Sequence, residues 1–94
     1  MNLFEFDKTT FRVHPTPEAL LLKVFGDIWK RDKSKDKELA LKELSFVWFY
    51  CDVRSHFLIQ SPEVRTIEII KDVDLPKTWK PDKLVREAIE YYQS

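Results

Sequence analysis

The sequence predicts a mainly α-helical fold: a small cluster of about four helices with an extended or hairpin N-terminal arm. Gly26 is the only glycine among 94 residues, and tight β-hairpins depend on glycine for positive φ angles. Apolar residues recur at three- and four-residue steps, which is the spacing of a buried helix face. The five prolines fall between these segments or at their starts. We expect one domain over residues 1–94, with the arm at 1–15 and the helical cluster at 16–94.

Residues 3–13 are predicted to form the extended arm. Phe4 and Phe6 flank a charged residue, and Phe11 begins a second alternating segment, a pattern typical of strands. Residues 7–10 could turn between the two halves and make the arm a hairpin. Because an isolated hairpin is marginally stable in water, the arm must pack on the helices or add to the sheet edge of a partner.

The first helix is predicted to begin after Thr16, whose side chain suits an N-cap, with Pro17 at the first helical position. Its apolar stripe continues to Ile28. Gly26 lies in the helix interior, where glycine costs about 1 kcal/mol relative to alanine. We therefore expect another backbone to pack closely against it.

The second helix is predicted to start near Asp36 and to reach Tyr50. The charged run before it, residues 30–38, is interpreted as a solvated connector, with a phosphate-binding patch as the alternative. The second half of this helix is apolar on every side and must be covered on two sides. Residues 46–50 also have strand propensity, but the helix-forming residues 39–44 lead into them without a breaker, so a helix is favoured.

A loop at residues 52–58 is expected to precede a third helix that begins at Ser61 and Pro62. Residues 66–70 could instead form a strand, because they are rich in isoleucine. Trp79 is expected to anchor the connector that follows. The last helix is predicted to open at Pro81 and Asp82, with one clean apolar face.

Composition argues against several classes of protein. Sixteen basic and sixteen acidic residues cancel, whereas nucleic-acid binders usually carry a basic excess, so nucleic acid is an unlikely partner. The longest apolar run, residues 44–51, is far shorter than the roughly 20 residues of a membrane span. Cys51 is the single cysteine and has no internal disulfide partner, which favours a reducing compartment. We expect a soluble protein that does not bind membranes.

No motif in the sequence indicates catalysis. His14, Cys51 and His56 lack the spacing of a metal site, so no metal or other cofactor is predicted. Cys51 lies in an apolar stretch, where thiol reactivity falls. The third and fourth helices could imitate a DNA-reading helix-turn-helix, but their linker is longer than the three- or four-residue turn of that motif. We predict no catalytic residue, no small-molecule substrate and no enzyme activity.

Protein docking is the remaining prediction. We expect the aromatic content to exceed what a chain this short needs for its own core, and aromatic side chains commonly anchor interfaces. Arg54 either pairs with a charge at its own helix end or with an acid on a neighbouring subunit. The predicted interface residues are Phe4, Phe6, Phe11, Phe46, Trp48, Phe49, Tyr50 and Arg54.

Five short motifs resemble a family of small virion structural proteins of large tailed bacteriophages, including crAss-like phages. The similarity spans most of the chain, and one departure is His56, which stands where the family has proline. The matching segments are PEALL at 17–21, RDKSKDK at 31–37, KELSFVWFY at 42–50, DVRS at 52–55 and WKPD at 79–82.

The resemblance implies a non-enzymatic structural component of a tailed-phage virion, associated with the portal, neck, tail or capsid. Its partners would be other virion proteins and copies of itself. It would reside in the virion, and in the host cytoplasm during assembly. Two alternatives stay open from the residues: a phage-encoded regulator or inhibitor that binds a host protein or DNA, and an accessory subunit of an enzyme.

Overall fold

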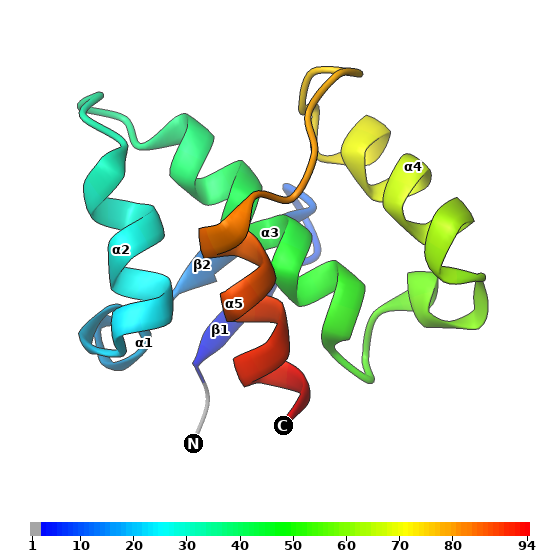
Figure 1. Ribbon diagram of the computed structural model, residues 1–94, viewed down its shortest axis with the longest axis horizontal. Coiled ribbons are helices and arrows are strands. Elements are labelled where there is room, and N and C mark those ends of the chain that lie inside the picture. The colour runs from blue at the N-terminus through cyan, green and yellow to red at the C-terminus, as the bar shows by residue number, and fades with distance from the viewer. Residues whose placement is uncertain (1–2) are drawn as a thin grey trace.

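The chain folds as an N-terminal β-hairpin followed by helices, in a computed structural model that describes residues 3–94 (Figure 1). The predicted mainly α fold with a hairpin arm is confirmed; the first two residues of the predicted arm lie outside the described residues. The elements are β1 (Phe4–Asp7), β2 (Arg12–Pro15), α1 (Pro17–Leu21), α2 (Lys23–Arg31), α3 (Glu38–Cys51), the short 3-10 helix η1 (His56–Ile59), α4 (Pro62–Asp72) and α5 (Lys83–Gln93).

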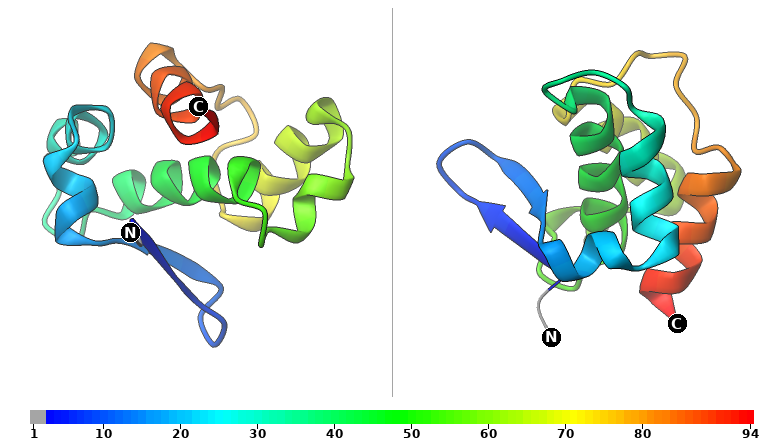
Figure 2. Two further views of the ribbon diagram at one scale, coloured as in Figure 1. Left: turned by 90° about the horizontal axis from the view of Figure 1, so that it is seen from below. Right: turned by 90° about the vertical axis from the view of Figure 1, so that its left-hand side faces the viewer.

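Helix α3 is the centre of the fold. The hairpin packs on one side of it, and α2 and α5 pack on another (Figure 2). Helix α4 and η1 pack against its C-terminal half. Every residue from 43 to 49 is buried, so the prediction that this stretch must be covered on two sides is confirmed. No helix within residues 3–94 has the length and apolar composition needed to cross a membrane.

The hairpin packs on the helices of its own chain. Its strands are antiparallel, with Phe6 opposite Val13. The hydroxyl of Ser45 in α3 donates to the carbonyl of Val13 at 3.4 Å. Phe11 closes the turn with a left-handed φ of 56°, an unusual conformation for a bulky residue. Ring stacking against α3, described below, holds Phe11 in that conformation.

The predicted first helix is broken at Leu22, which has an extended conformation (φ −79°, ψ 128°) and separates α1 from α2. A single continuous helix was therefore a wrong prediction. The break brings the carbonyl oxygen of Leu20 to 2.6 Å from the position that a Cβ on Gly26 would occupy. The expected close approach of another backbone to Gly26 is confirmed.

The charged connector between α2 and α3 is a loop held together by side-chain hydrogen bonds. Helix α3 starts at Glu38, and its N-cap position is held by Lys37 with φ 55°. The carboxylate of Asp32 accepts from the backbone N–H of Ala40 at 2.9 Å and from Ser34. These hydrogen bonds lower the pKa of Asp32 to about 2, and the bond from the Ser34 hydroxyl has the largest effect. Asp36 was expected to be the N-cap of α3, but Lys37 holds that position. Asp36 accepts from the N–H of Glu38 at 3.2 Å and from the hydroxyl of Ser34 at 3.1 Å.

The later helices follow the predicted starts. Ser61 and Asp82 accept hydrogen bonds from Val64 and Val85, the third residues of α4 and α5. Helix α4 is continuous, so the alternative of a strand at residues 66–70 is wrong. Residues 56–59, expected in a loop, form η1.

Candidate docking site

The eight predicted interface residues divide by burial. The side chains of Phe46, Phe49, Phe4 and Trp48 are between 0 and 2% exposed. These four belong to the core of the folded chain, so the prediction that they form a docking surface is wrong for them. The reason is that the hairpin and α5 cover the aromatic stretch of α3, which sequence alone assigned partly to a partner. The others are Phe6 and Tyr50, which are half-buried, and Phe11 and Arg54, which are exposed.

On the hairpin side of α3, aromatic rings interlock. Phe6 stacks on Trp48 with 5.1 Å between ring centroids, and Phe11 stacks on Phe49 at 4.9 Å. Phe57 of η1 meets the Phe49 ring edge-on at 5.5 Å. Stacked and edge-to-face pairs of this kind add stability beyond area burial. Their arrangement closes this side of α3 against solvent.

Arg54 is paired within its own chain. Its guanidinium donates to both oxygens of the Asp52 carboxylate at 2.8 and 3.0 Å, and lies 5.4 Å from the centroid of a Trp48 ring. Asp52 also accepts from the hydroxyl of Tyr92 on α5. These hydrogen bonds lower the pKa of Asp52 to about 2; those from Arg54 have the largest effect, and the bond from Tyr92 adds to it. An acid on a neighbouring subunit is therefore not needed to satisfy Arg54.

On the other side of α3, a groove of about 670 Å³ opens between α4 and α5. Phe46 and Tyr50 stack at 5.7 Å beneath it. Because Phe46 is fully buried, the accessible apolar floor comes from the half-buried side chains of Tyr50 and Ile89. Figure 1 shows α4 and α5 set apart and joined by a long connector. The remaining lining residues are Ile89 and Pro81, with Thr66, Lys80, Arg86, Glu90 and Gln93.

Arg65 fixes α4 to the end of α3. Its guanidinium donates to the backbone carbonyls of Tyr50 and Gln60 at 3.1 and 3.0 Å. It also lies 4.9 Å from the centre of the Tyr50 ring, close enough for a cation–π interaction. Helix α4, which forms one wall of the groove, is thereby attached by polar contacts to Tyr50 in its floor.

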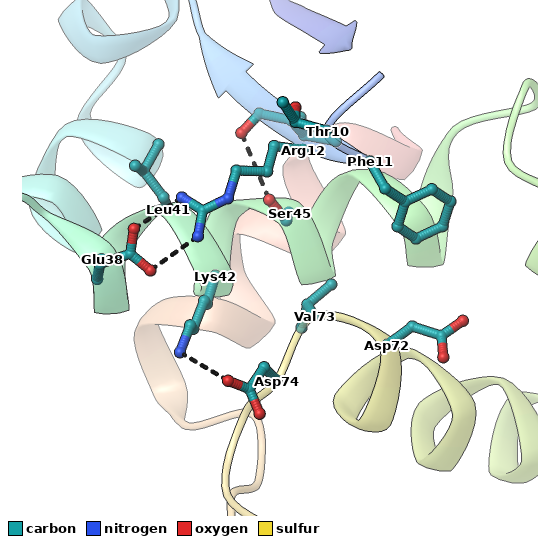
Figure 3. Close-up of a pocket in the computed structure, with 11 residues that line it drawn as sticks. Thr10, Phe11, Arg12, Glu38, Leu41, Lys42, Ser45, Asp72, Val73 and Asp74 are labelled. Atoms are coloured by element: carbon teal, nitrogen blue, oxygen red, sulfur yellow. Dashed lines mark hydrogen bonds and ion pairs between the residues drawn. The ribbon is translucent and has the colours of Figure 1, made fainter. Parts of the chain in front are cut away.

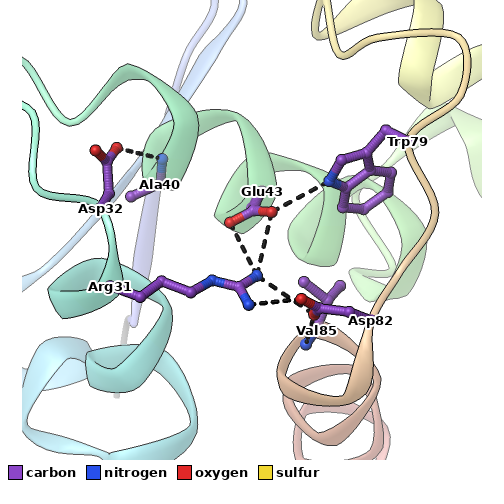
Figure 4. Close-up of polar contacts among 7 residues, drawn as sticks. All are labelled: Arg31, Asp32, Ala40, Glu43, Trp79, Asp82 and Val85. Carbon is purple, nitrogen blue, oxygen red and sulfur yellow. Dashed lines mark hydrogen bonds and ion pairs between the residues drawn. The ribbon is translucent and has the colours of Figure 1, made fainter.

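A buried carboxylate, that of Glu43 in α3, connects α2 to the connector that precedes α5 (Figure 4). Glu43 is 5% exposed and accepts from Arg31 of α2 at 3.1 Å and from the indole N–H of Trp79 at 3.1 Å. Arg31 also pairs with Asp82, which caps α5. Trp79 in turn lies 4.8 Å from the Phe46 ring. The expected anchoring role of Trp79 is confirmed by these contacts.

Sequence reasoning missed the Glu43 network because its members are far apart in the chain. The one local signal was an acid in the middle of a helix that is otherwise apolar. Such an acid is rarely buried without a charged partner. The partner's identity followed only from the packing of α2 against α3.

A small polar pocket of about 190 Å³ lies between the hairpin, α3 and the end of α4 (Figure 3). Two ion pairs cross it, Arg12 with Glu38 at 2.7 Å and Lys42 with Asp74 at 3.6 Å. Both basic groups already face a carboxylate, so the pocket offers no concentrated positive charge to an anionic ligand.

The groups considered for chemistry are dispersed. Residues 3–94 contain no cluster of three or more histidine, cysteine or acidic side chains arranged to hold a metal ion. Burial raises the pKa of the Cys51 thiol to about 12, which suppresses the reactive thiolate. The ring of His56 rests against Phe57, with 4.1 Å between centroids.

Among residues 3–94, half of the exposed large apolar side chains lie in one segment, from the end of α3 to the middle of α4. Four of the eight belong to residues 53–67. Such a concentration differs from the scattered single residues that are normal on protein surfaces. The four are Val53 (88% exposed), Ile59 (93%), Val64 (45%) and Ile67 (65%).

Comparison of the chain with protein-family models, curated proteins and solved structures finds no match. The grounds for a functional proposal are therefore the groove, the exposed apolar segment and the sequence motifs.

Proposed function

We propose that the protein is a non-enzymatic structural component of a tailed-phage virion, at the portal, neck, tail or capsid. It acts by docking other virion proteins, and it resides in the host cytoplasm until assembly. The observation that carries the proposal is the groove between α4 and α5, with its apolar floor and charged rim. The five sequence motifs supply the phage assignment.

The groove has the anatomy of a helix-docking site. Its floor is apolar and its rim is polar, as in protein interfaces generally. Phe46 is fixed in the core and Tyr50 is held by Arg65, so the floor is ordered before a partner arrives. A preordered surface loses little conformational entropy on binding. An amphipathic helix that lays its apolar face on such a floor is a common mode of recognition.

The rim indicates the charge of the partner. Lys80 and Arg86 are exposed, and neither forms an ion pair with an acid in the described part of the chain. Arg86 donates instead to the carbonyl of Pro81 at 2.8 Å. Glu90 is the one acid in the lining, so the rim carries a net positive charge. The groove therefore fits an amphipathic helix whose apolar face is flanked mainly by acidic residues.

The first test is the presence of the protein in purified particles. Virions banded on a density gradient should contain the chain at a fixed ratio to the major capsid protein, measured by quantitative mass spectrometry. Absence from the particle would contradict the proposal. Capture of a single host polymerase subunit or nuclease from lysate, with no virion protein, would instead support the alternative of a regulator.

The second test addresses the groove. Arg86→Glu should weaken capture of virion proteins by the tagged chain, because it reverses charge on the rim. Lys83→Glu is the matched control, since it makes the same charge change on α5 outside the groove lining. Thr66→Trp should block capture by filling the groove. Equal capture by all three variants would contradict docking at this site.

A further inference from the structure

The outer face of α4 is free of the rest of the chain and carries an unusual arrangement of side chains. Val64 and Ile67 are 45% and 65% exposed. Ile69, on the opposite face, is buried, and so is Ile70, which borders the face beside Ile67. Glu63 and Lys71 lie four residues before and four residues after Ile67, so helical spacing places all three on one face. Helix α4 lies at one side of the molecule (Figure 1).

This face is complementary to itself. When two α4 helices pair in antiparallel fashion about a two-fold axis at Ile67, residue 63 of each lies opposite residue 71 of the other. Two identical Glu63–Lys71 ion pairs then flank an Ile67–Ile67 contact. The aliphatic part of Lys71 covers Val64 of the other copy. Within residues 3–94, neither Glu63 nor Lys71 has an ion-pair partner.

We propose that the outer face of α4 docks a second copy of this chain as an antiparallel, two-fold symmetric pair. The inference goes beyond docking in the groove, because only Thr66 of α4 lines the groove. The face is small beside the interfaces of stable dimers, and Glu68 and Asp72 add acid at its flank. The pair is therefore weak in dilute solution and is favoured where copies are held close together.

Sedimentation equilibrium of the full chain at concentrations up to about 1 mM tests the pairing. The unmodified chain should show a reversible monomer–dimer equilibrium. Ile67→Glu should lower the association constant at least about tenfold, because it places like charges at the axis. Leu21→Glu is the matched control: Leu21 is 86% exposed at the end of α1, and its replacement should leave the constant unchanged. A monomer throughout, or equal loss in both variants, would overturn the proposal.

Charge reversal tests the antiparallel geometry. Glu63→Lys alone places lysine opposite lysine, and Lys71→Glu alone places glutamate opposite glutamate, so each should self-associate about fivefold more weakly. Mixed in equal amounts, these two variants present opposite charges at both positions. The mixture should form a heterodimer more tightly than either variant pairs with itself. A mixture no better than its components would rule out this pairing, and circular dichroism verifies that each variant is folded.

Discussion

The two sides of α3 carry the same kinds of side chain and are closed in different ways. On the hairpin side, Trp48 and Phe49 are sealed by rings from β1, the hairpin turn and η1. On the other side, Tyr50 and Ile89 form the accessible floor of a groove above the buried Phe46, and polar contacts help to fix the helices around it. The difference follows from geometry: β2 and α5 each pack directly on α3, whereas α4 and α5 are set apart from each other and joined by a long connector (Figure 1).

On the hairpin side, stacked rings keep Trp48 and Phe49 almost fully buried, so their contacts stabilise the folded chain itself. Directional polar contacts hold α4 and α5 at fixed positions without filling the space between them. A binding surface needs such an arrangement: rigid walls and an accessible apolar floor. The groove side should therefore be more sensitive to the loss of a charged side chain than the hairpin side.

The largest expected effect compares neighbouring residues on the two sides. Phe49→Ala should lower the free energy of unfolding by about 4 kcal/mol, because it leaves a cavity among four other rings. Tyr50→Ala should cost about 2 kcal/mol, since Tyr50 is only half-buried. Urea unfolding followed by circular dichroism measures both. Equal losses would show that the two sides do not differ in packing.

The next prediction concerns the polar contacts of the groove side. Glu43→Ala should cost about 3 kcal/mol, because it leaves Arg31 and the indole N–H of Trp79 without their buried acceptor. Glu87→Ala is the control, as Glu87 is exposed on α5, and it should change the urea midpoint very little. A loss no larger than that of the control would mean that the network contributes nothing to the fold.

The pH dependence should reveal the link between α3 and α5. The folded pKa of Asp52 is about 2, below its ordinary value of 3.8. The resulting stability is fully present above pH 3.8 and is lost as the pH falls through about 2. It amounts to about 2 kcal/mol. Unfolding free energies measured from about pH 5 to about pH 2 should therefore decline.

Asp52→Asn removes this contribution and should make that decline shallower. It should not abolish the decline, because the pKa of Asp32 is lowered in the same direction. Tyr92→Phe should preserve most of the decline, since Arg54 is the main cause of the Asp52 shift. A decline in Asp52→Asn as steep as in the unmodified chain would contradict this assignment.

The smallest expected effect is that of Gly26→Ala in α2, a position that belongs to neither side of α3. Helix propensity alone predicts that Gly26→Ala stabilises α2 by about 1 kcal/mol. The clash with the Leu20 carbonyl should reverse the sign and destabilise the chain by about 1 kcal/mol. Thermal unfolding measures this difference. A rise in the melting temperature would show that the α1–α2 corner can relax.

Local signals were sufficient for the helix starts. Thr16 and Ser61 cap α1 and α4 where those helices were predicted to begin, and Asp82 caps α5 at its predicted start, because an N-cap acts on N–H groups only a few residues away. The break at Leu22 was not predictable in the same way. No proline or glycine marks it, and it exists because α1 and α2 pack against different neighbours. The capping of α3 by Asp32 likewise depends on how the loop folds back.

The sequence by itself determined that this chain is mainly helical, that an extended arm precedes the helices, and that the apolar second half of the central helix, residues 45–51, needs cover on two sides. Those conclusions follow from periodicity and composition, which act locally. Only the tertiary structure decided what supplies the cover. The hairpin and α5 enclose Phe4, Phe46, Trp48 and Phe49, so the accessible surface lies in the groove and on the outer face of α4. Burial depends on which elements meet in space, and a linear pattern of apolar residues does not encode that choice.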